Sequence, residues 1–72
     1  MTDAMPNVTK ALKLMDSDPR SHMFAAAIPQ VLAAGLKAWH SSTPYQLDYR
    51  IEFVMDAMAE SLLKVADSPP TE

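Results

Sequence analysis

Four carboxylates recur at four-residue intervals in the second half of the chain. They are Asp48, Glu52, Asp56 and Glu60. Residues four apart share one face of a helix, so this spacing places the four acids in a row along a single helix. Acid–base catalysis needs carboxylates that converge in a protected pocket, whereas this row projects toward solvent. We interpret it as a solvated ridge and expect no enzymatic activity.

The two histidines also lack the spacing of a reactive site. His22 and His40 are 18 residues apart, which is about 27 Å along a helix at 1.5 Å per residue. Neither belongs to a His-Glu-x-x-His or Glu-x-x-His pattern, and the chain has no cysteine. Its single glycine excludes glycine-rich phosphate loops. We therefore expect no catalytic residues, no metal and no cofactor.

Three aromatic residues alternate with the acids, and together they form a candidate binding surface. Tyrosine and other aromatics are enriched in binding hot spots, and flanking charges can steer a complementary partner. This pattern predicts contact with a protein that presents basic and apolar groups; the alternative is that a short first helix or a second subunit covers the aromatics. We call this surface the acidic–aromatic ridge, and its residues are Tyr45, Asp48, Tyr49, Glu52, Phe53 and Asp56.

The charge distribution disfavours direct binding of nucleic acid. The net charge is −3, and residues 42–72 carry six acids against two bases, whereas affinity for phosphates depends on Lys and Arg. A helix-turn-helix reading remains the alternative, with a turn at Asp16–Pro19 before the second helix. That helix would offer only Arg20 and His22 near its start, followed by an apolar run.

Apolar periodicity and helix-capping residues predict three helices, over residues 8–16, 19–40 and 44–65. Pro29 predicts a kink or a short break in the second helix near residues 25–28, because it removes a backbone hydrogen bond. Thr43, Pro44 and Gln46 resemble a capping box that starts the third helix. We predict one helical domain over residues 7–66, with disordered tails at 1–6 and 67–72.

The predicted fold is all-α, an antiparallel helical hairpin preceded by a short N-terminal helix. Two long helices of similar length with a short connection favour this arrangement. We expect Leu32, Leu36, Ile51 and Met58 to form the core between the two long helices.

A chain of 72 residues buries little surface, and without disulfides its remaining support is self-association. We expect a homodimer that packs into a helical bundle. The residues predicted for self-association are Phe24, Ile28, Leu32 and Trp39.

The functional expectation is a regulator or inhibitor that binds another protein, with a DNA-associated regulator or a small structural subunit as the alternative. The most apolar stretch, residues 23–39, contains Pro29, Gln30 and Lys37 and is too short and too polar for a membrane span. The first residues have no signal-peptide pattern. We expect a cytoplasmic protein.

Overall fold

The computed structural model describes residues 5–18 and 21–67, and of residues 21–23 only the backbone. Within these residues the protein consists of helices alone, which confirms the all-α prediction. The order is α1 (Pro6–Ser17), a 3-10 segment η1 (Ser21–Ala27), α2 (Ile28–Ser41) and α3 (Leu47–Asp67). Residues 1–4 and 68–72 of the predicted tails lie outside the described residues, as do Pro19 and Arg20.

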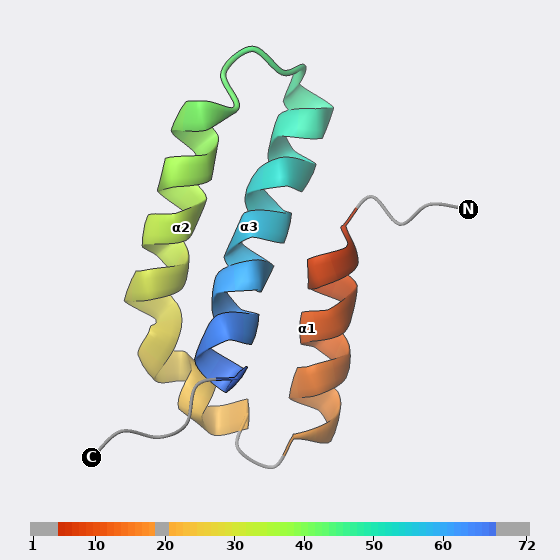
Figure 1. Ribbon diagram of the computed structural model, residues 1–72, viewed down its shortest axis with the longest axis vertical. Coiled ribbons are helices and arrows are strands. Elements are labelled where there is room, and N and C mark those ends of the chain that lie inside the picture. The colour runs from red at the N-terminus through yellow and green to blue at the C-terminus, as the bar shows by residue number, and fades with distance from the viewer. Residues whose placement is uncertain (1–4, 19–20, 68–72) are drawn as a thin grey trace.

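The three α-helices lie side by side in a single layer (Figure 1). α3 is the central helix and packs against both α1 and α2, whereas α1 and α2 do not contact each other among the described residues. The molecule measures 40 × 29 × 15 Å along its principal axes. Because an α-helix with its side chains is about 10–12 Å across, the thickness of 15 Å leaves room for one layer of helices. Both broad faces of that layer are therefore open.

Small residues bring α2 close to α3. Gly35 and Ala38 are buried in this contact. A Cβ placed on Gly35 would lie only 2.8 Å from both Cγ and Sδ of Met58. With no side chain on Gly35, the Met58 side chain packs directly against the backbone of α2 here.

The predicted core was wrong for three of its four residues. Leu36 is 63% exposed, Leu32 53% and Ile51 44%, while Met58 does lie against α2. The physical reason is that α2 turns its glycine and alanine side toward α3. On the helical projection Leu36 lies about 100° from Gly35 and Leu32 about 60° from it. Both leucines then face outward.

The buried core is small as a result. Among the described residues the buried apolar side chains are Ala11, Phe24, Ala27, Ala38 and Ala59. Phe24 is the only large one of this group, so most of the chain's large apolar side chains remain at the surface.

The helix boundaries differ from the prediction by more than two residues at two places. α2 begins at Ile28 with Pro29 in its first turn, after the separate 3-10 segment. A proline is tolerated there because the first N–H groups have no intrahelical partner. α3 begins at Leu47 rather than Pro44, since residues 42–46 form a turn with a hydrogen bond from the Tyr45 N–H to the Ser42 carbonyl (3.0 Å).

Candidate protein-interaction surfaces

The ridge aromatics lie where residues 42–46 meet the start of α3. Tyr45, Tyr49 and Phe53 are all exposed, and Tyr49 is the most exposed of them at 65%. The rings of Tyr45 and Phe53 pack edge to face, with centroids 5.8 Å apart and an interplanar angle of 76°. This ring contact orients the two aromatics, while Tyr49 stands free beside them.

A shallow depression joins four of the six ridge residues. Its lining residues are Pro44, Tyr45, Gln46, Tyr49, Glu52 and Phe53. Glu52 contributes the only carboxylate of this lining. Asp48 is exposed on the same end of α3 but does not line the depression. The structure therefore brings together Tyr45, Tyr49, Glu52 and Phe53 as one surface.

Asp56, the sixth ridge residue, is engaged within the chain. Its Oδ1 accepts hydrogen bonds from the backbone N–H groups of Asn7 (2.8 Å) and Val8 (3.3 Å), and its Oδ2 accepts one from Asn7 Nδ2 (2.9 Å). These N–H groups belong to the first turn of α1, whose own N-cap residue, Met5, makes no side-chain cap. A carboxylate at a helix N-terminus satisfies free donors and interacts favourably with the helix dipole. Asp56 thus fastens α1 to α3.

Trp39, predicted for self-association, is partly covered by Arg50 of α3. The Arg50 guanidinium carbon lies 3.3 Å from the Trp39 ring centroid. Arg50 Nη2 and Nε also donate to the Trp39 carbonyl (2.9 and 3.3 Å), and Nε donates to Ser42 Oγ (3.2 Å). Ser42 is fully buried and donates its own hydroxyl to the Trp39 carbonyl. This cluster closes the C-terminal end of α2 onto α3.

The other residues predicted for self-association divide between interior and surface. Phe24 is buried at 7% exposure and belongs to the core, whereas Ile28 and Leu32 are exposed. Ile28 and Leu32 continue with Leu36 as a stripe at four-residue spacing along α2.

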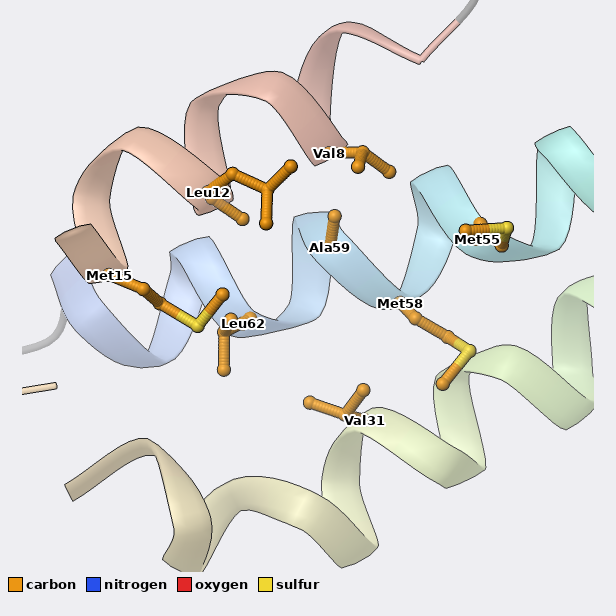
Figure 2. A pocket seen from close by; sticks show the side chains of 9 residues that line it. Val8, Leu12, Met15, Val31, Met55, Met58, Ala59 and Leu62 are labelled. Carbon is orange, nitrogen blue, oxygen red and sulfur yellow. The ribbon is translucent and has the colours of Figure 1, made fainter. Parts of the chain in front are cut away.

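An apolar groove runs between α1 and α2 over the central helix α3 (Figure 2). It encloses about 220 Å³, and no polar or charged residue lines it. Figure 2 shows Leu12 and Met15 of α1 on one side, Val31 of α2 on the other and Leu62 of α3 between them. The complete lining is Val8, Ala11, Leu12, Met15, Val31, Met55, Met58, Ala59 and Leu62.

Sequence reasoning missed this groove. It treated Leu32 and Leu36 as the inward side of α2, so the Gly35 side of this helix was not considered as part of a surface beside α3. The signal that could have found it is the spacing of Val31, Gly35 and Ala38 on one side of α2. Small residues at such spacing permit close helix contact.

The opposite face of the layer is more polar. A depression there is lined by Ala34, Lys37, Ala38, Ser41, Ala57, Glu60, Ser61 and Lys64. The two broad faces of the molecule therefore differ in chemistry, one with an apolar groove and the other with charged and hydroxyl groups.

Within residues 5–18 and 21–67, no three His, Asp or Glu side chains lie close enough together to hold a metal ion. None of the helices in this part of the chain is long and apolar enough to cross a membrane. No protein-family model, curated protein or solved structure matches the chain.

Proposed function

We propose that this protein is a non-enzymatic interaction protein that regulates or inhibits another protein by binding its surface. The binding surface is the part of the acidic–aromatic ridge formed by Tyr45, Asp48, Tyr49, Glu52 and Phe53. The observation that carries the proposal is the exposure of all three aromatics beside carboxylates at one end of the layer.

The chemistry of this surface indicates the kind of partner. Aromatic side chains bury a large area with few rotatable bonds, which suits them to a hot spot. Glu52 lies in the depression and Asp48 next to it, so basic groups on the partner are favoured. Nucleic acid is disfavoured because these carboxylates would face its phosphates.

The contact between α2 and α3 gives this surface its rigidity. Arg50 ties the connection to the end of α2 through the Trp39 carbonyl and Ser42 Oγ. Tyr45 belongs to that connection, and its ring packs on Phe53 of α3. A surface held in this way loses little conformational freedom on binding.

The first experiment identifies the partner by affinity capture of the tagged protein from its native cell, with and without nuclease. A protein partner is retained after nuclease treatment. Loss of all captured material on nuclease treatment would instead support the alternative of a DNA-associated regulator.

The second experiment tests the ridge with purified components and a Tyr49→Ala, Glu52→Lys double variant. We expect binding of the captured partner to weaken by at least about 10-fold, since truncation of a hot-spot aromatic costs about 2 kcal/mol or more. Loss of Tyr49 should mainly speed dissociation, whereas the charge reversal should slow association at low salt.

Glu60→Lys is the matched control, because it makes the same charge change on α3 but lies on the polar face outside the ridge depression. Circular dichroism checks that each variant keeps the helicity of the parent. A folded double variant that binds as tightly as the parent would show that the ridge is only a solvated helix face.

A further inference from the structure

The large exposed apolar side chains gather on the groove side of the layer. We call this surface the apolar face, and its residues are Leu12 and Met15 of α1, Ile28, Leu32 and Leu36 of α2, and Ile51 and Met55 of α3, all of them exposed. Leu12, Met15 and Met55 line the groove directly.

The helical geometry of α2 places its leucines on this same side. Gly35 and Ala38 face α3, while Ala34, Lys37 and Ser41 line the depression on the polar face. At 3.6 residues per turn, Leu32 and Leu36 lie on the other side of the contact line from Ala34 and Lys37. The stripe of Ile28, Leu32 and Leu36 therefore borders the groove.

The apolar face has the composition of a covered surface. Residues 21–36, which include the whole α2 stripe, contain no Asp, Glu, Lys or Arg. Monomeric soluble proteins rarely leave a large continuous apolar patch open to water. Because four of the five buried apolar residues among the described residues are alanines, the layer by itself buries little large apolar surface.

We propose that a second copy of this chain covers the apolar face, so that two layers pack face to face as a symmetric dimer. The layer measures 40 × 29 Å across this face, which accommodates the roughly 800 Å² per partner of a stable interface. If the fold needs this face covered, the covering partner has to be present wherever the chain is made. A second copy of the chain always meets that condition.

The proposed dimer pairs the α2 stripe of each copy with the groove of the other. The α2 stripe is a ridge, and the groove of about 220 Å³ runs beside it. A two-fold axis midway between the two and parallel to them exchanges ridge and groove, so each copy lays its Ile28–Leu36 stripe over the groove of the other. Such an isologous contact is the usual form of a homodimer. This interface is separate from the ridge of the proposed function, which stays at the edge of the layer.

The test is the mass of the full chain in solution, measured by light scattering over a range of concentrations. The parent should give about twice 7.9 kDa. Leu36→Glu should raise the dissociation constant of the dimer by at least about 100-fold, because symmetry would bury two charges. Gln30→Glu is the matched control, since Gln30 is exposed on the same helix and lies about 160° from Leu32 on the helical projection; it should remain a dimer.

Leu36 is exposed within one copy, so Leu36→Glu supports the proposal whether it yields a folded monomer or a chain that unfolds without its partner. A second readout avoids this perturbation. The chain has no cysteine, so single-cysteine variants can be joined by a short bifunctional maleimide. Leu36→Cys should cross-link between copies at least about 10-fold faster than Gln30→Cys, because the dimer holds only the first site close to the other copy.

Three results would overturn the proposal. They are a parent that is a fully helical monomer at micromolar concentration, a Leu36→Glu variant that remains a dimer, and equal cross-linking at positions 30 and 36. A monomeric parent that sediments with phosphatidylcholine vesicles would assign the face to lipid instead. The ridge variant of the proposed function should leave dimer mass unchanged, so failure of one proposal does not imply failure of the other.

Discussion

Gly35 is the residue at which α2 meets the side chain of Met58. A Cβ at this position would be 2.8 Å from both Cγ and Sδ of Met58, so even alanine requires the methionine to move. Glycine lowers helix stability by about 1 kcal/mol relative to alanine, and here that cost is offset by close contact between two helices. The smallest residue of the helix thus decides which side of α2 faces inward.

Gly35→Ala should therefore destabilise the protein despite the better helix propensity of alanine. Overpacking costs about 1–3 kcal/mol, against about 1 kcal/mol gained in propensity. The loss should shrink when Met58 is also changed to alanine, with a coupling energy of about 0.5–3 kcal/mol in a double-mutant cycle. Urea unfolding of the parent, both single variants and the double variant measures this coupling energy.

Ala33→Gly provides the opposite control for this cycle, since it changes an exposed position of the same helix. It should cost about 1 kcal/mol from propensity alone and show no coupling to Met58. Additive effects of Gly35→Ala and Met58→Ala would contradict the assignment of Gly35 as the contact point.

At the scale of elements, the helices themselves could be predicted from the sequence, but their inward sides could not. Apolar periodicity placed α1, α2 and α3 correctly in order and approximate extent. The prediction took the side of α2 with the larger apolar residues, Leu32 and Leu36, as the inward side. In the structure the inward side is that of Gly35 and Ala38. Periodicity identifies an apolar stripe, but it does not say whether a neighbouring helix in the same chain covers it.

The start of α3 and the role of Asp56 were missed because both depend on contacts between distant segments. The Arg50 hydrogen bonds to the Trp39 carbonyl and Ser42 Oγ hold residues 42–46 as a turn, which delays α3 to Leu47. Asp56 fitted the four-residue acidic pattern, but its carboxylate meets a helix that begins 50 residues earlier in the chain. The relative positions of Tyr49 and Phe53 were predictable because both lie on one local stretch of helix, whereas Tyr45 lies in the turn before it.

α1 is held at its N-terminus by Asp56, so Asp56→Ala should loosen this helix before the rest of the protein. Hydrogen bonds to a charged group contribute about 1.5–3 kcal/mol, and two backbone donors of α1 would lose theirs. Hydrogen exchange of residues 6–17 should accelerate by about 10-fold or more, since each 1.4 kcal/mol changes the opening equilibrium tenfold.

Asp48→Ala is the control for this measurement, because Asp48 is an exposed acid on the same helix, whereas Asp56 is the one that accepts the hydrogen bonds from α1. It should leave exchange in α1 unchanged. Equal protection of residues 6–17 in the parent and in Asp56→Ala would mean that packing around Ala11 alone retains the helix.

At the scale of the whole molecule, a single layer of helices has two broad faces, and no further helix among the described residues covers either of them. α3 is covered at its two flanks by α1 and α2, but the groove above it is lined by apolar side chains that water can reach. Each large side chain that becomes fully buried contributes about 1.5–3 kcal/mol. Burial of the seven exposed residues of the apolar face would therefore stabilise the fold more than the small internal core does alone.

This distribution predicts that folding stability depends on protein concentration. Association of folded chains stabilises them by mass action, so the melting temperature of the parent should rise by a few degrees for each tenfold increase in concentration. Leu36→Ala removes side-chain area that is 63% exposed within one copy and that the proposed dimer would cover. At concentrations where the parent is a dimer, the melting temperature of Leu36→Ala should lie several degrees below that of the parent. This difference in melting temperature should narrow on dilution, because both proteins then dissociate. Circular dichroism melts of both proteins over a hundredfold range of concentration provide the measurement. If the two melting temperatures differ by the same amount at every concentration, Leu36 acts inside a single chain, and the apolar face contributes to the protomer rather than to the contact between copies.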